Sequence, residues 1–166
     1  ITVKDIQRSE RYPSSVRDKN GRLLVGAAVG TKIDDLERAI SLDKSGVDIL
    51  FIDTAHGHSN SVIDAFKKIR KKTHCPIVVG NIATPEAAKD LIKLGVDAIK
   101  VGIGPGSICT TRVVAGVGVP QFTAIQEISS VSFKSKIPMI SDGGIRFSGD
   151  IAKALAAGGN CIMAGS

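Results

Sequence analysis

The chain has 166 residues, of which 43% are hydrophobic, 23% are charged and only 4% are aromatic. This is the composition of a globular domain, and no apolar run reaches the ~18 residues that a membrane-spanning helix needs. The net charge of +6 suits an anionic ligand, but scattered basic residues and few aromatic ones argue against nucleic-acid binding. Three cysteines without a Cys-x-x-Cys pair form no closed disulfide framework, so we expect free thiols in a reducing compartment, the cytoplasm.

Residues 1–22 are polar and basic, with Pro13 and Gly21 as breakers, and we interpret them as a linker arm on the surface. Residues 23–166 alternate short apolar runs with amphipathic stretches and are expected to form the folded domain. Runs rich in Val and Ile are typical of strands buried on both faces. The predicted strands are Leu23–Val29, Asp48–Asp53, Ile77–Gly80, Ala98–Gly102, Met139–Ser141 and Cys161–Ala164.

Helical patterns lie between these runs. The segment Asp34-Asp35-Leu36-Glu37 has the form of a capping box and predicts the start of a helix. Thr84 followed by Pro85 predicts another helix start, and Ser148 predicts the cap of the last one. Further helices are expected over Val62–Ile69 and Thr123–Ser130.

The chain contains an internal repeat, because residues 91–102 align without gaps with residues 154–165. Each copy has the pattern of a helix end, a glycine C-cap and a strand, which predicts repeated βα units and a parallel sheet. We therefore predict an α/β fold with about six βα units. Repeated βα units with glycines at the strand ends favour a TIM (β/α)8 barrel over an open Rossmann sheet. The barrel is expected to be incomplete, because a complete one typically needs about 250 residues. In either fold, function belongs at the C-terminal ends of the strands.

The segment from Lys100 to Arg112 is the most informative one. A strand runs into a loop that carries glycines, hydroxyl groups and Cys109. Cys109 has no acidic neighbour and has a nearby arginine, which favours the thiolate. A nucleophilic cysteine is therefore expected, with a buried structural cysteine in a tight turn as the alternative. Cys75 and Cys161 lie at strand entries and are expected to be structural.

Four other strand ends carry polar groups. Asp142-Gly143-Gly144 suits a ribose phosphate, with the carboxylate on ribose hydroxyls and the glycine amides on the phosphate. Gly165-Ser166 resembles the phosphate site that follows the last strands of a barrel. Asp53-Thr54-Ala55-His56-Gly57-His58 has a spacing that could hold a metal, but a ribose-binding Asp53 is favoured. Asn81 also ends a strand and could face the pocket.

Taken together, these segments resemble the IMP dehydrogenase / GMP reductase family. The similar segments are Val101–Arg112, Ala115–Gln121, Asp142–Asp150 and Asp53–Ser59. The Gly-Pro-Gly-Ser-Ile-Cys-Thr-Thr loop is specific to this family, and the resemblance covers essentially the whole chain. Val119-Pro120-Gln121 and Ile145-Arg146-Phe147-Ser148 resemble the dehydrogenases rather than the reductases.

The resemblance implies NAD-dependent oxidation of IMP to XMP. Cys109 would attack carbon 2 of the purine and form a covalent thioimidate, and Thr111 would lie beside the reacting ring. The implied substrate-binding residues are Ser107, Asp142, Gly143, Gly144, Gly165 and Ser166. The implied NAD-binding residues are Asp53, Thr54, Ala55, Asn81, Gly102, Ile103 and Gly104. A potassium ion would be bound by the backbone carbonyls of Gly104, Gly106 and Cys109.

The resemblance also implies what flanks these residues in a longer protein. The strands would be the third to eighth of a barrel, and residues 1–22 would be the tail of a CBS-pair module, with Ile1–Ile6 as its exit strand. A flap with an Arg–Tyr pair that activates the hydrolytic water would follow Ser166. The full-length protein is expected to be a homotetramer. Two alternatives stay open, a GMP reductase and a non-catalytic nucleotide-binding remnant.

Overall fold

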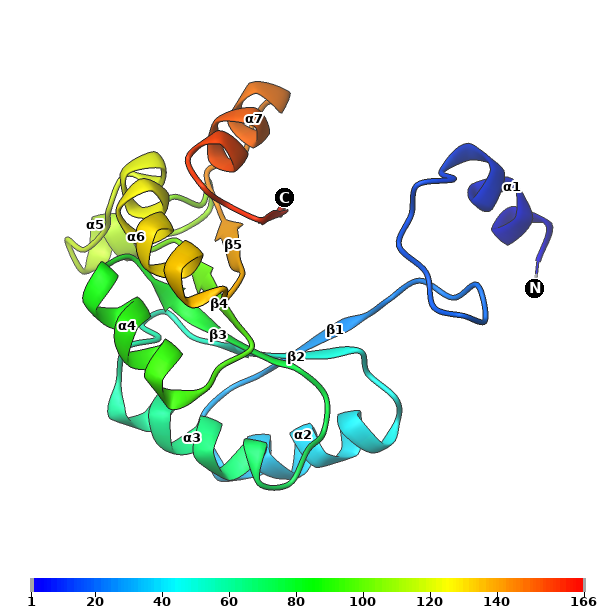
Figure 1. The fold of residues 1–166 in the computed structure, drawn as a ribbon, viewed down its shortest axis with the longest axis horizontal. Helices are drawn as coiled ribbons and strands as arrows, with labels where there is room; N and C mark the ends of the chain where they lie inside the picture. Colours follow the sequence, from blue (N-terminus) through cyan, green and yellow to red (C-terminus); the bar gives the residue numbers. More distant parts are fainter. Residues whose placement is uncertain (1, 166) are drawn as a thin grey trace.

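The computed structural model describes residues 2–165, and a six-stranded parallel sheet is its main feature (Figure 1). The strands are β1 (Gly26–Val29), β2 (Ile49–Asp53), β3 (Ile77–Ile82), β4 (Ala98–Val101), β5 (Met139–Asp142) and β6 (Cys161–Met163). They pair in sequence order, β1-β2-β3-β4-β5-β6. A Rossmann sheet reverses its order at a central strand, whereas sequential order is the barrel arrangement. The predicted incomplete barrel is confirmed as a curled half-barrel.

Helices cover the outer face of this sheet (Figure 1). They are α2 (Ile33–Lys44), α3 (Asn60–Arg70), α4 (Pro85–Leu94), α6 (Gln121–Ser135) and α7 (Ser148–Ala156). Their apolar faces pack against the strands, with Phe66, Leu91 and Ile125 buried. Burying one such side chain contributes roughly 1.5–3 kcal/mol, so this layer between helices and sheet is the main core.

The concave face of the sheet carries a second, smaller apolar cluster. Successive strand residues point to opposite faces. Val78, Ala98 and Ile140 form the concave cluster, while their strand neighbours Val79, Ile99 and Met139 belong to the core under the helices. The same alternation, continued toward the C-terminal strand ends, places Asp53, Lys100 and Asp142 on the concave face.

Two helices begin differently from the prediction. Helix α2 is capped by Asp35, whose carboxylate accepts the backbone N–H groups of Gly30 (2.9 Å) and Lys32 (2.8 Å), and not by Asp34 with Glu37. Ser148 is the first residue of α7 rather than its cap. There the Asp150 carboxylate accepts the N–H groups of Arg146 and Phe147, both at 2.9 Å. In both helices an acidic residue in the first turn reaches back to the preceding loop, which replaces a hydroxyl cap.

The prediction at Thr84 is confirmed, since its side chain accepts the N–H of Ala87 at 3.3 Å. Gly95 ends α4 in the left-handed conformation with φ +90°, as the repeat pattern requires. Helix α6 is longer than expected at both ends, since it starts at Gln121, directly after a proline, and ends at Ser135.

The N-terminal segment lies apart from the barrel (Figure 1). It contains helix α1 (Val3–Arg11) where an exit strand was expected at Ile1–Ile6, so the expectation of a strand is wrong for its described residues. The division into a linker arm over 1–22 and a barrel over 23–166, with an upstream CBS pair, stays a prediction. None of the helices within residues 2–165 is long and apolar enough to cross a membrane.

Candidate active site

The cysteine loop follows β4 and leads into the short helix α5 (Thr111–Val114). The Cys109 sulfur lies 3.3 Å from the Thr111 hydroxyl oxygen, and the Cys109 backbone N–H donates to the Gly106 carbonyl at 3.2 Å. Hydrogen bonds from Thr111, and then the positive charge of Arg112, hold the pKa of Cys109 below its ordinary value. Such a thiol is a better nucleophile at neutral pH than an unperturbed cysteine.

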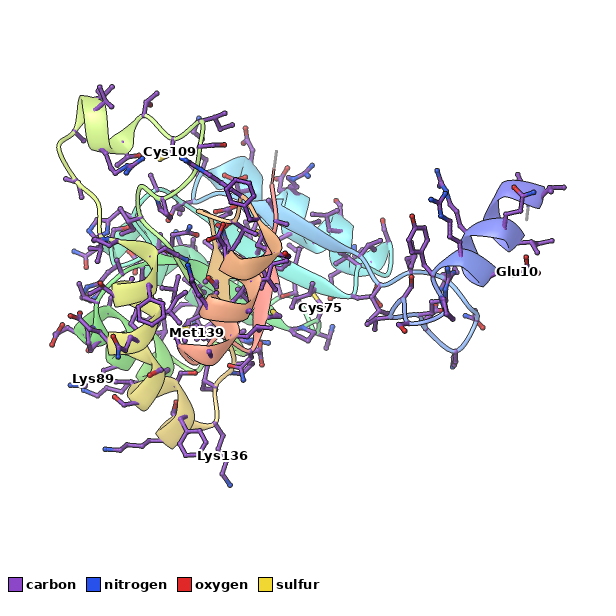
Figure 2. All side chains as sticks on the ribbon, turned by 90° about the horizontal axis from the view of Figure 1, so that it is seen from above. Glu10, Cys75, Lys89, Cys109, Lys136 and Met139 are labelled. Atoms are coloured by element: carbon purple, nitrogen blue, oxygen red, sulfur yellow. The ribbon has the colours of Figure 1, made fainter. Side chains whose placement is uncertain are left out.

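The other two cysteines lie in environments of the opposite kind. Burial, together with the nearby Asp43 carboxylate, raises the pKa of Cys75 to about 11. Partial burial also raises the pKa of Cys161. Figure 2 shows Cys109 at the top of the barrel, well separated from Cys75 and from Lys136 at the other end of the molecule. The half-buried Cys75 thus fits the expectation of a structural cysteine, whereas Cys161 is exposed on β6 and its structural role stays a prediction.

Glycines allow the strand ends around the loop to approach closely. A Cβ on Gly102, whose φ is +149°, would lie 2.0 Å from the Asp142 carbonyl oxygen. A Cβ on Gly143, whose φ is +94°, would lie 2.9 Å from a ring carbon of Pro105. No other residue fits at either position without displacing its neighbours.

A cavity of about 210 Å³ lies between the cysteine loop and the loop after β5. Its lining includes Ser107, Asp142, Gly143, Gly144 and Gly165, which are all the predicted substrate-binding residues within residues 2–165. Ser166 lies outside the described residues. Arg146 also lines the cavity and was not predicted as a site residue. Cys109 is not itself a lining residue, but it follows directly after Ile108, which is one.

The predicted NAD-binding residues lie at the ends of three neighbouring strands or in the loops that follow, and Asn81 connects them to the cavity. The Asn81 amide donates to the Gly102 carbonyl at 2.7 Å and to the Asp142 carboxylate at 2.9 Å. These two acceptors fix the orientation of the amide. Its own oxygen, Oδ1, is buried without a hydrogen-bond partner among the residues that the structure describes.

Thr54 and Ala55 differ in what they can offer to a ligand. The Thr54 hydroxyl donates to the Gly80 carbonyl at 2.9 Å. Its proton is therefore used in a hydrogen bond between the end of β2 and β3. Ala55 is exposed. Contacts from these two residues to a cofactor would therefore come mainly from the backbone.

The predicted potassium site has oxygen donors of the right kind, but too few of them to complete the coordination shell of the ion. Backbone carbonyls are the oxygen donors that select potassium in proteins. Gly104, Gly106 and Cys109 supply three at most, and the Gly106 carbonyl already accepts the Cys109 N–H. The alternative metal pattern gains no support, because residues 2–165 contain no group of three His, Cys, Asp or Glu side chains that could hold a metal. His58 instead pairs with Asp90 at 3.0 Å.

Two polar residues that organise the site were missed by the sequence analysis. The Lys100 ammonium lies 3.0 Å from Asp53 Oδ1 and also contacts Asp142 Oδ2. The Gln121 amide donates to the Val101 carbonyl at 2.9 Å and to the Ser141 hydroxyl at 3.0 Å, which ties the end of β4 to the end of β5. A lone lysine within an otherwise apolar strand is a sequence signal that could have drawn attention to Lys100.

Comparisons with known proteins agree with this geometry. The family model described as "IMP dehydrogenase / GMP reductase domain" matches residues 2–166. Inosine-5′-monophosphate dehydrogenases from Staphylococcus aureus and Chlorobaculum tepidum are 57% and 54% identical to the chain over its whole length. The chain spans 34% of the length of each, about a third.

Solved structures of GMP reductase from Trypanosoma brucei are also similar. One in complex with guanosine 5′-triphosphate is 46% identical with a TM-score of 0.90, over 100% of this chain and 40% of that one. Another, in complex with guanosine 5′-monophosphate, is 46% identical with a TM-score of 0.90, over 99% of this chain and 35% of that one.

Proposed function

The chain belongs to the IMP dehydrogenase / GMP reductase family, and from this membership we propose that the protein containing it oxidises IMP to XMP with NAD as the hydride acceptor. The curated relatives that support the dehydrogenase reading are 53% to 57% identical to the chain. The observation that carries the proposal is the placement of Cys109. It is the cysteine whose pKa is lowered, and it follows directly after Ile108, which lines a cavity together with Asp142, Gly143 and Gly144.

The proposed chemistry begins with the Cys109 thiolate, which adds to carbon 2 of the purine and forms a carbon–sulfur bond. The C2–H bond then breaks, and its electron pair leaves with the hydrogen as a hydride. NAD, when bound, supplies the two-electron acceptor for that hydride. Water adds to the thioimidate left on Cys109, the carbon–sulfur bond breaks, and the thiolate returns as XMP leaves. In sum, carbon 2 is oxidised by two electrons, NAD is reduced to NADH, and one proton is released.

The residues of this chain have distinct tasks in that sequence. Once the thiol has lost its proton, the Thr111 hydroxyl, 3.3 Å away, would donate a hydrogen bond to the Cys109 thiolate and stabilise it before the attack. Asp142 accepts hydrogen bonds from the ribose hydroxyls of IMP. The backbone N–H groups of Gly143 and Gly144 and the Arg146 guanidinium bind its phosphate, with Ser107, Gly165 and Ser166 as further contacts.

The NAD-binding surface consists of Asp53, Thr54, Ala55, Asn81 and the segment 102–104. The half-exposed Asp53 carboxylate fits a cofactor that carries ribose hydroxyls. Bound beside the cavity, NAD would receive the hydride at short range, and this proximity accounts for much of the rate acceleration.

Further properties of the complete protein are proposed on the family resemblance alone. Potassium would be held in part by the carbonyls of Gly104, Gly106 and Cys109 and would stabilise the cysteine loop. The complete protein would be a homotetramer in the cytoplasm, where the three unpaired cysteines of this chain would remain reduced.

One experiment tests the reaction and its nucleophile together. The protein as encoded by its gene is mixed with IMP and NAD, NADH formation is followed by absorbance, and the trapped adduct is measured by intact mass. We expect an adduct of IMP on Cys109 that Cys109→Ser abolishes and that the control Cys161→Ser retains. NADH formation by Cys109→Ser at the parent rate would refute the assignment of the nucleophile.

A second candidate, GMP reductase, is supported by the 46% identical solved structures. Oxidation of NADPH in the presence of GMP, without NADH formation from IMP, would establish it. A non-catalytic nucleotide-binding role would instead give saturable IMP binding and no turnover with either pair of substrates.

A further inference from the structure

Lys100 joins two carboxylates that the proposed function assigns to different ligands. Its ammonium contacts Asp142, proposed to bind the ribose of IMP, and Asp53, proposed to bind NAD. We infer that Lys100 is a positioning residue that fixes both carboxylates at once and thereby couples the binding of IMP to the binding of NAD. The inference rests on the proposed function and adds to it a residue that touches neither ligand.

The register of the sheet explains how one lysine reaches both carboxylates. Asp53 of β2 pairs with Gly80 of β3, and Gly80 pairs with Lys100 of β4, so the three residues form one row on the concave face. Gly80 has no side chain in the middle of this row. A Cβ there would lie 2.6 Å from the Lys100 Cβ. The glycine therefore leaves open the path along which the Lys100 ammonium approaches Asp53 to 3.0 Å.

Burial separates the role of the lysine from that of the two carboxylates. The Lys100 side chain is 3% exposed, whereas those of Asp53 and Asp142 are 44% and 23% exposed. A ligand in the site therefore meets the carboxylates and not the ammonium behind them. A lysine this deeply buried requires charged partners, because an unpaired ammonium is costly to remove from water.

Each carboxylate keeps one oxygen for a ligand. Oδ2 of Asp142 is engaged by Lys100 and also accepts the Asn81 amide at 2.9 Å, which leaves Oδ1 for a ribose hydroxyl. Oδ1 of Asp53 is engaged by Lys100, which leaves Oδ2. If Asp53 shifts when NAD binds, the Lys100 ammonium shifts with it and its contact with Asp142 changes. A displacement at the NAD side is therefore transmitted to the IMP side. Because such coupling is a free energy between two sites, it must act equally in both directions.

The test measures equilibrium binding in the protein as encoded by its gene, with Cys109→Ser as the parent so that IMP and NAD bind without reacting. Isothermal titration gives the Kd for IMP in the parent and in Asp53→Asn. We expect Asp53→Asn to raise the Kd for IMP about fivefold or more, the lower range of typical coupling, although Asp53 belongs to the NAD side. The matched control is Asp34→Asn, which removes the same charge from an exposed turn of α2 and should leave the Kd unchanged.

A second set of variants isolates the lysine. Lys100→Met should weaken the binding of both ligands, and in that background Asp53→Asn should have no further effect on IMP binding. Lys100→Arg keeps the charge and should restore part of both affinities, a rescue that a merely space-filling role would not give. If Lys100→Met does not fold, the coupling is tested by the Kd for IMP in Asp53→Asn and by the affinities of Lys100→Arg for both ligands.

The outcomes separate this inference from the proposed function. If the parent binds IMP and NAD but Asp53→Asn leaves the Kd for IMP unchanged, the coupling through Lys100 is refuted and the proposed function stands. If the parent binds neither IMP nor NAD, the proposed function is refuted, and the positioning role of Lys100 is refuted with it.

Discussion

Removing the Asp43 carboxylate is expected to destabilise the fold in a pH-dependent way. Asp43, in the last turn of α2, accepts the backbone N–H of Cys75 at 3.0 Å and that of His74 at 3.1 Å, which ties the helix to the segment before β3. These hydrogen bonds lower the pKa of Asp43 from 3.8 to about 2. At about 1.4 kcal/mol per pKa unit the shift corresponds to roughly 2 kcal/mol. Since the carboxylate is 15% exposed, we expect about 1–2 kcal/mol after solvent screening.

The sign of the effect follows from the lowered pKa. The stabilisation is complete above the unfolded-state pKa of 3.8 and is lost as the pH falls toward about 2. Asp43→Asn should therefore unfold about 1–2 kcal/mol more easily than the parent at neutral pH, and the difference should shrink in acid. Urea denaturation of both proteins at neutral pH and at about pH 3 measures this. Equal stabilities at neutral pH, or an undiminished difference in acid, would refute the reasoning.

Two further predictions concern the site. Thr111→Val removes the hydroxyl that hydrogen-bonds the Cys109 sulfur, so the pKa of that thiol should rise and its alkylation by iodoacetamide at neutral pH should slow severalfold. Gly102→Ala places a Cβ 2.0 Å from the Asp142 carbonyl oxygen at a φ of +149°, and the free energy of unfolding should fall by about 2 kcal/mol or more in urea denaturation.

Each of these has a matched control. Thr110→Val, on the exposed residue next to Thr111, should leave the alkylation rate unchanged. Gly149→Ala, at a helical position with open space around the new methyl group, should be neutral or stabilising by up to about 1 kcal/mol. An alkylation rate in Thr111→Val equal to that of the parent, or a Gly102→Ala protein as stable as Gly149→Ala, would contradict the respective prediction.

The fold was largely predictable because its strands are short apolar runs punctuated by glycines. All six predicted strands are confirmed, and the largest discrepancy is at the first, which begins at Gly26 rather than Leu23. Leu23 and Val25 are apolar yet more than half exposed, at 55% and 54%, so hydrophobicity alone overextended that strand. The sequence pattern shows which residues are apolar. Where a strand begins is decided instead by backbone pairing with the neighbouring strand.

The site was predictable where it lies on loops and missed where it depends on contacts across strands. The glycine-rich motifs indicated Cys109 and the residues around Asp142, because glycines and polar groups at strand ends carry a local signal. The contacts of Lys100 with Asp53 and Asp142 arise only when four strands are placed in register. Gln121 likewise acts through its distance to Ser141 in space, which no spacing along the chain records.

The sequential order of the strands also bears on how the chain folds. Every strand pairs with the one that precedes or follows it along the chain, so each step of sheet formation closes a single crossover loop. Contacts therefore have low sequence separation for a parallel sheet, which favours fast folding. The half-barrel from β1 to β6 therefore forms without any crossover that skips a strand, so no pairing within it waits for a strand from the far end of the sequence.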